Sequence, residues 1–395
     1  MNISSYRWTI LILFTALVGV NQMLVINFAP LVTTLQSKFG VSDFMAGLPT
    51  LLSPITYLVF GYHAGISLDK HGYKKVLLAS AILMSICGFM RIFEMSYSGL
   101  LIAHLGISIS GVYITCAIAK VVCDWFVPEK IGMATGIVMA GLLLGIGVGV
   151  GGTAVLVAEM GFYETMKIYA FTALIITILF VFFGRENVQF EKHQEQINDP
   201  DATAMFKDKN LLIVFTLAFL VIGSLNGFNN WFEKIMSLNG FNPEQAGYVV
   251  AISLLFSIVG SSLIPVISDK LGRRKPFLIL SALIAMLLTQ PFLSTTDMNT
   301  ALSIAGISGL LQLPSYTLII ALAAMFAGPA RAGMANGIVM LAGSLGGVVI
   351  AILMEVVGGW FGWQYSAWVL VFAAFLTLLT IFKLTEPEVV VNEYA

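Results

Sequence analysis

The chain has 395 residues, of which 58% are hydrophobic and only 10% are charged, and its formal net charge is −1. Soluble proteins carry about 25% charged residues, so this composition excludes an ordinary soluble protein and favours an all-α membrane protein. The near-neutral charge argues against bulk attraction to nucleic acid. The three cysteines (Cys87, Cys116 and Cys123) lie in or beside apolar stretches, without metal-site or disulfide spacing. We therefore expect no metal and no cofactor.

Apolar stretches that are long enough to cross a membrane recur along the whole chain. A membrane-spanning helix needs about 20 apolar residues. The first stretch is too long for a cleavable signal and lacks a small-residue cleavage site. Twelve segments qualify as spans: 8–31, 44–64, 76–96, 99–122, 133–157, 165–184, 211–233, 246–267, 277–295, 300–325, 334–357 and 364–384.

A polar segment, 185–210, divides these spans into six and six. Its composition is that of a linker and not of a folded domain. The chain is therefore expected to form an N-terminal six-helix bundle (1–184), a cytosolic linker (185–210) and a C-terminal six-helix bundle (211–395).

Lysine and arginine predict the orientation of the spans. With both termini in the cytosol, sixteen of these residues, Lys120 among them, lie at or near the inner side and three lie near the outer side. Cytosolic loops are enriched in such residues. We expect a multi-pass protein of the cell (inner) membrane with both termini cytosolic.

Short motifs return at an offset of 200 or 201 residues. Gly132–Met139 (GMATGIVM) returns as Gly333–Met340 (GMANGIVM), and Asp69–Lys75 returns as Asp269–Lys275. Matches in register indicate a duplicated unit in parallel orientation, which in a membrane protein points to transport.

The segment Gly65–Lys75, between spans 2 and 3, closely resembles the signature loop of the major facilitator superfamily. Its copy between spans 8 and 9 matches again, except that Pro265 stands where Gly65 does in the first copy. With the six-plus-six layout, the resemblance covers essentially the whole chain. It implies twelve transmembrane helices in two pseudo-symmetric six-helix bundles, which rock against each other in alternating access.

Each copy of this loop contains an aspartate, Asp69 or Asp269, at the end of a span. A buried carboxylate at this place needs a partner. A helix N-terminus can supply one, worth about 0.3–1 kcal/mol. The resemblance implies that Asp69 contacts span 11 and that Asp269 contacts span 5, which would hold the cytosolic side closed. The alternative is that both loops only set the topology. The predicted latch comprises Asp69, Lys70, Gly72, Lys74, Lys75, Gly132, Asp269, Lys270, Gly272, Arg273, Arg274 and Gly333.

In this family spans 1, 4, 7 and 10 line a central cavity, and these spans carry many polar residues. Polar side chains inside a membrane tend to face a bundle interior or water. They therefore predict a binding site for a polar solute, although hydrogen bonds between helices are the alternative. A broken helix at Asn226–Asn230 that acts as an outer gate is a further expectation, with a similar part for Pro314 in span 10. The alternative for both is a static kink. The predicted cavity residues are Asn21, Gln22, Asn27, His104, Ser108, Tyr113, Asn226, Asn229, Asn230, Trp231, Gln312 and Tyr316.

Few charges lie within the spans. His104 is the best candidate for proton coupling, because the reference pKa of histidine is near 6.5; a structural hydrogen bond is the alternative. Arg91 and Glu94 are three residues apart and are expected to form an ion pair on one helix face, with Glu355 as a second potential partner.

These patterns predict a transporter and not an enzyme. We expect a secondary active or facilitative transporter of a small polar or zwitterionic organic solute, a uniporter or a symporter, acting as a monomer among membrane lipids. The first alternative is a proton-coupled drug or metabolite exporter of the same fold, which would need a pH gradient. The second is a transport-dead receptor, which would bind ligand without flux.

Overall fold

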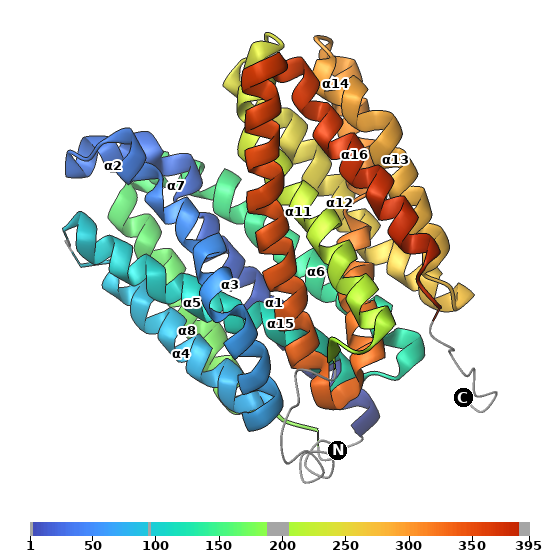
Figure 1. The fold of residues 1–395 in the computed structure, drawn as a ribbon. Coiled ribbons are helices and arrows are strands. Elements are labelled where there is room, and N and C mark those ends of the chain that lie inside the picture. The colour runs from blue at the N-terminus through green and yellow to red at the C-terminus, as the bar shows by residue number, and fades with distance from the viewer. Residues whose placement is uncertain (1–2, 94–95, 188–204, 387–395) are drawn as a thin grey trace.

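The computed structural model describes residues 3–93, 96–187 and 205–386, and nearly all of these residues lie in helices (Figure 1). The first half contains α1 (Ile3–Ile26), α2 (Val32–Phe39), α3 (Asp43–His71), α4 (Tyr73–Met90), α5 (Tyr97–Trp125), α6 (Ile131–Gly147), α7 (Thr153–Met160) and α8 (Phe162–Phe183). The second half contains α11 (Lys209–Leu238), α12 (Pro243–Leu271), α13 (Lys275–Ser294), α14 (Met298–Leu311), α15 (Pro314–Phe361) and α16 (Trp363–Phe382). Short 3-10 turns cover Ala29–Leu31 and Pro128–Lys130, and a π-helical turn covers Val148–Gly152 between α6 and α7.

Within the described residues, eleven helical stretches are long and apolar enough to cross a membrane. One of them, Met298–Phe361, has 64 residues, whereas a single span needs about 20. Its backbone leaves the helical conformation at Gly328 (φ 69°, ψ 170°), immediately before Pro329. The stretch therefore holds two spans, and the predicted all-α architecture with twelve spans is confirmed.

The duplication is visible in the backbone as well as in the sequence. Glycine reaches a positive φ without the steric cost that other residues meet, so it marks tight turns. Six of the seven described glycines with positive φ form pairs whose members lie 200 or 201 positions apart: Gly40 and Gly240, Gly72 and Gly272, and Gly161 and Gly362. The seventh is Gly328, at the break within α15.

Polar N-caps follow the same repeat. The Ser42 hydroxyl accepts a hydrogen bond from the Met45 amide at the start of α3, and Asn242 and Gln245 form a capping box at the start of α12. Such caps satisfy backbone amides that have no partner within the helix.

The two halves pack closely at one end of the molecule and separate toward the other (Figure 1). We call the closed end, where the loops Asp69–Lys75 and Asp269–Lys275 lie, the basic end. There α3 and α5 pack on α15, and α12 packs on α6. One continuous hydrophobic core joins both halves, while a second core lies within the second half alone.

The helix of span 7 is not broken, in contrast to the prediction. The sequence Asn226–Asn230 predicted a broken helix, but α11 is continuous through it. Gly223 and Gly227 let α11 approach the α15 backbone closely, and a Cβ at Gly223 would lie 2.7 Å from the Gly346 backbone. This packing holds the helix against the local turn preference of asparagine and glycine.

Span 10 does contain an interruption near Pro314. The helix α14 ends at Leu311, and α15 begins at Pro314, so that Gln312 and Leu313 form a turn between them. Proline at the first position of a helix is well tolerated, because the amide it lacks has no partner there.

Candidate functional site

Asp69 stands at the end of α3 and is buried, with 7% of its surface exposed. Its carboxylate accepts hydrogen bonds from the backbone amides of Gly333 (3.1 Å) and Met334 (2.6 Å) in the second part of α15. A Cβ at Gly333 would lie 2.8 Å from the Asp69 Oδ1 atom. Only glycine therefore lets the carboxylate reach this point of the helix.

Lys120, on α5, is the charged partner of Asp69. Its ammonium group lies 3.2 Å from the Asp69 Oδ1 atom and is fully buried. It also donates a hydrogen bond of 2.5 Å to the carbonyl oxygen of Pro329, at the break within α15. Sequence reasoning counted Lys120 only among the basic residues of the inner side. The signal for this role was its position inside an apolar span, where a lysine needs a partner.

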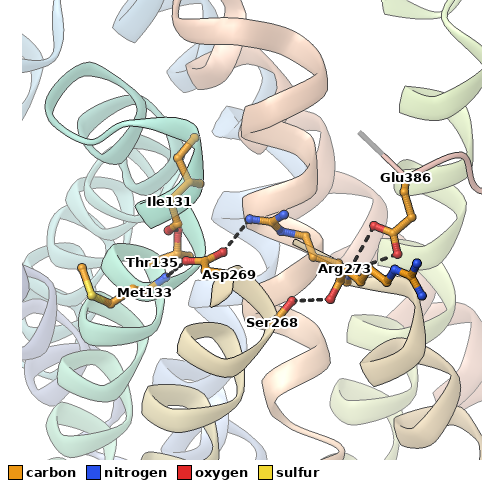
Figure 2. Close-up of polar contacts among 8 residues, drawn as sticks. Ile131, Met133, Thr135, Ser268, Asp269, Arg273 and Glu386 are labelled. Atoms are coloured by element: carbon orange, nitrogen blue, oxygen red, sulfur yellow. Dashed lines mark hydrogen bonds and ion pairs between the residues drawn. The ribbon is translucent and has the colours of Figure 1, made fainter. Parts of the chain in front are cut away.

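Asp269, at the end of α12, occupies the equivalent position in the second half (Figure 2). Its carboxylate accepts a 2.6 Å hydrogen bond from the Met133 amide at the start of α6 and lies 2.6 Å from the Arg274 guanidinium. Burial lowers the pKa of Arg274, while the Asp269 and Glu386 carboxylates act in the opposite direction. A Cβ at Gly132 would lie 2.5 Å from the Asp269 Oδ1 atom, so a glycine is needed here as well.

The two carboxylates are thus neutralised differently. Asp69 uses Lys120 from a neighbouring helix, whereas Asp269 uses Arg274 from its own loop. We call the contacts of Asp69 with Gly333, Met334 and Lys120, and those of Asp269 with Met133 and Arg274, the latch contacts. Except for the Arg274 pair, which lies within one loop, and the Lys120 pair, which lies within the first half, they join the two halves.

A second pair of carboxylates supports these loops, and sequence reasoning missed it. Glu386, labelled in Figure 2, lies beside the start of α13. It accepts hydrogen bonds from the backbone amides of Arg274 (3.1 Å) and Lys275 (2.6 Å). Glu186, 200 positions earlier, lies against Gly72, where any side chain would collide with its carboxylate. A carboxylate at a helix N-terminus is stabilised by the free amides and the helix dipole. The signal was available, because both glutamates follow the last span of their half.

Several other residues of the predicted latch lie at the surface or in the turns of the loops. Gly72 and Gly272 adopt φ of 80° and 61° and reverse the chain. The residues Lys70, Lys75, Lys270 and Arg273 are exposed, and Lys74 is half-buried.

A cavity of about 490 Å³ lies between the halves and extends into the second bundle. Four of the predicted cavity residues line it: Asn226, Asn229, Gln312 and Tyr316. The Gln312 amide nitrogen donates to the Ser308 hydroxyl (3.2 Å), and the Tyr316 hydroxyl donates to the Met340 sulfur (3.2 Å). Within the described part of the chain, the side chains of Asn226 and Asn229 have no hydrogen-bond partner, and both are exposed.

The polar residues of spans 1 and 4 were expected on the cavity wall, but the structure places them elsewhere. Asn21 is fully buried within the first bundle and donates to the Ser110 hydroxyl (3.3 Å). Ser108 is buried too, and Tyr113 contacts His63 at 2.7 Å. Gln22 is half-buried. Of these residues, Asn21 and Ser108 are enclosed within the first bundle, whereas Gln22 and Tyr113 are half-buried and off the described wall.

Two residues of span 7 also lie away from the wall. The indole nitrogen of Trp231 donates to the Ala351 carbonyl on α15 (2.9 Å), and Asn230 is exposed.

Arg91 and His104 form a buried pair inside the first bundle. The Arg91 guanidinium contacts His104 Nδ1 and donates to the Leu24 carbonyl (3.2 Å) and the Asn27 side chain (3.4 Å). It also lies 4.6 Å from the centre of the Phe28 ring. His104 is therefore not on the wall of the cavity.

The expected ion pair of Arg91 with Glu94 lies outside the described residues, because Glu94 is not among them. The other suggested partner, Glu355, is exposed on α15, whereas Arg91 is 2% exposed. Among the ion pairs of the described residues, none joins Arg91 to Glu355.

Comparison with known proteins gives a consistent picture. The family model described as the Major Facilitator Superfamily matches residues 11–239 and 214–393. An uncharacterized protein of Archaeoglobus fulgidus is 28% identical over 195 residues, covering 49% of this chain and 89% of that protein. A quinolone resistance transporter of Acinetobacter baumannii is 24% identical, covering 88% of each chain. The structure of a proton:xylose symporter superposes with a TM-score of 0.80 at 16% identity, covering 97% of each chain.

Proposed function

The chain belongs to the major facilitator superfamily, and on that premise we propose that it carries a small organic solute across a membrane by alternating access. Its multi-pass helices and the transporters among its relatives support this reading over an enzyme. The observation that carries the proposal is that Asp69 and Asp269 each bind backbone amides of the opposite half at the basic end, while a cavity lies between the halves.

The latch contacts are suited to a reversible closure. Those that join the two halves are a few hydrogen bonds from backbone amides to carboxylates, each worth about 1.5–3 kcal/mol. Such contacts can separate when one bundle rocks against the other, because no covalent bond is broken and the amides and carboxylates can be hydrated in the open state. In this proposal the structure represents the state closed at the basic end.

We propose further that the basic end faces the cytosol of a cell whose inner membrane holds the protein. The density of lysine and arginine at this end supports that orientation. A single chain contains both halves and the cavity, so the proposed transport unit is a monomer surrounded by lipid.

The proposed mode of transport is facilitative. Symporters that use protons usually carry a titratable carboxylate or histidine within the cavity helices. Among the described residues, no such group lines this cavity, and His104 is enclosed with Arg91 instead. The alternative is proton-coupled transport through His104, and the enclosed position of this residue does not support it.

A second function, export of drugs or metabolites, is favoured by one observation. The described wall of the cavity is largely aliphatic and aromatic, and one relative is a quinolone resistance transporter. Such an exporter would depend on a pH gradient.

Uptake into proteoliposomes tests both functions. The panel would contain neutral, anionic, cationic and zwitterionic solutes, including a quinolone, with and without a pH gradient. Flux that is independent of the gradient is expected. Flux that requires it would support the exporter, and ligand binding without any flux would indicate a receptor.

A further inference from the structure

The wall of the central cavity identifies the kind of solute it accepts. We infer that it binds an uncharged amphipathic ring compound, whose apolar body packs on the first half and whose hydrogen-bonding edge faces the second half. This inference rests on the proposed transport function and narrows its substrate class.

The contribution of the first half to the wall is entirely aliphatic. Its six described lining side chains come from α1, α6 and the π-helical turn, and none of them carries an N–H or O–H donor or an oxygen acceptor: Ile26, Met139, Leu142, Leu143, Ile146 and Val150. A polar solute placed against this surface would lose hydrogen bonds to water without replacing them. An apolar body would gain from burial there.

The polar groups lie on the second half. Asn226 and Asn229 present amide groups that have no partner within the described residues, and Gln312 stands at the turn between α14 and α15. Each amide offers both a donor and an acceptor. A solute with a carbonyl, hydroxyl or amide on one edge therefore finds partners only on this side.

The wall also contains a cluster of aromatic rings. Phe228 lies 5.2 Å from Phe232 and 5.9 Å from Phe292 between ring centres, and all three line the cavity. Aromatic rings prefer offset or edge-to-face contacts at such distances. All three rings belong to the second half, so a planar ring that packs on the aliphatic side chains of the first half meets aromatic rings on its other face. The volume of about 490 Å³ lies in the range of cavities that hold drug-sized ligands.

Charge is absent from the described wall. None of its described side chains is an aspartate, glutamate, lysine, arginine or histidine. The buried charges of the first bundle are already engaged, Arg91 with His104 and Lys120 with Asp69. An ionised or zwitterionic solute would leave water without meeting an opposite charge, which is unfavourable. The amides and rings therefore select a neutral molecule in place of the zwitterion that the sequence suggested.

Three naphthalene derivatives of similar size, one neutral, one anionic and one cationic, test this inference. Binding of naphthalene-2-carboxamide, 2-naphthoate and 2-naphthylmethylammonium to the purified full chain in detergent is measured by calorimetry. The carboxamide is expected to bind at least about tenfold more tightly than either ion, because the ions bury an unpaired charge. Absence of carboxamide binding, or equal binding of either ion, overturns the inference.

Two pairs of variants locate the site. Asn229→Leu is nearly isosteric and should weaken carboxamide binding about fivefold through loss of one hydrogen bond, whereas Asn299→Leu, exposed on α14 and off the wall, should not. Ile146→Asp should raise the affinity for the ammonium compound about fivefold relative to Ile146→Asn, because a carboxylate then faces it. Unchanged affinities in both pairs overturn the placement of the ligand.

Flux separates this inference from the function on which it rests. Uptake of other solutes into proteoliposomes, with no binding of the carboxamide, would overturn the ligand class and leave transport standing. Tight and selective carboxamide binding, with no flux of any solute tested, would overturn transport and leave the ligand class standing.

Discussion

Asp69 and Gly333 are 264 positions apart in the chain, yet the carboxylate of the first accepts a 3.1 Å hydrogen bond from the backbone amide of the second. The same carboxylate accepts from Met334 and pairs with Lys120, so that one side chain joins α3, α5 and α15. Because α15 belongs to the second half and α3 and α5 to the first, opening of the basic end must break the contacts with Gly333 and Met334.

Asp69→Asn is expected to favour the state that is open at the basic end. The amide removes the charge that compensates the buried Lys120, and breaking a buried pair costs about 3–5 kcal/mol. The thiol of Cys123 lies beside this interface, 3.5 Å from the Ala324 carbonyl oxygen. Its rate of modification by a maleimide should rise several-fold in the variant.

Asp208→Asn is the control for this experiment, because Asp208 is an exposed N-cap of α11 and asparagine caps equally well. Lys120→Met should restore part of the stability lost in Asp69→Asn, because it removes the unpaired charge. An unchanged labelling rate in Asp69→Asn would count against the latch.

Gly333→Ala is expected to loosen the same end by a steric route. Its Cβ would lie 2.8 Å from the Asp69 Oδ1 atom, and the equivalent Cβ at Gly132 would lie 2.5 Å from the Asp269 Oδ1 atom. Gly333→Ala and Gly132→Ala should each increase Cys123 labelling and reduce transport. Gly147→Ala, where the new Cβ meets no atom within 4 Å, should leave both readouts unchanged. Equal behaviour of all three variants would mean that the close approach is not required.

Glu386→Gln is expected to loosen the start of α13 without unfolding the bundle. It removes the charge that caps the amides of Arg274 and Lys275, an interaction worth about 1 kcal/mol at a helix N-terminus. Hydrogen exchange at the first turn of α13 should become faster. Glu355→Gln, on an exposed face of α15, provides the comparison. Protection that is the same in both variants would show that Glu386 does not stabilise this turn.

His104→Leu is expected to lower thermal stability and to leave the pH dependence of uptake unchanged. Arg91 would lose an acceptor in a fully buried position, which costs about 1–3 kcal/mol. His71→Gln, at the exposed end of α3, should affect neither property. A change in the pH dependence of uptake in His104→Leu alone would instead assign proton coupling to this histidine.

Local sequence patterns were sufficient for the spans and the turns. The length of each apolar run specifies a membrane-crossing helix, and Gly72 and Gly272 specify tight reversals, because both depend on neighbouring residues only. The repeat at 200 or 201 residues likewise placed Asp69 and Asp269 at equivalent points of the two halves.

The contact partners of Asp69 and of the start of α13 could be identified only in the assembled bundles. Nothing local identifies Lys120 as the counter-charge of Asp69, or Glu386 as the cap of α13, because each contact joins segments that are distant in sequence. The continuous α11 is a similar case, since its close packing on α15 outweighs the turn preference of Asn226–Asn230.

Residue patterns alone were enough to predict an all-α membrane protein of twelve spans in two like halves, with an aspartate at the end of the second span of each. Which polar residues reach the cavity depends on the assembled bundles: Asn229 and Gln312 do, while Asn21 and His104 are enclosed within the first bundle. The physical reason is rotation about the helix axis. Hydropathy reports that a segment crosses the membrane, but the face it turns to the cavity is set by packing against helices from distant parts of the chain.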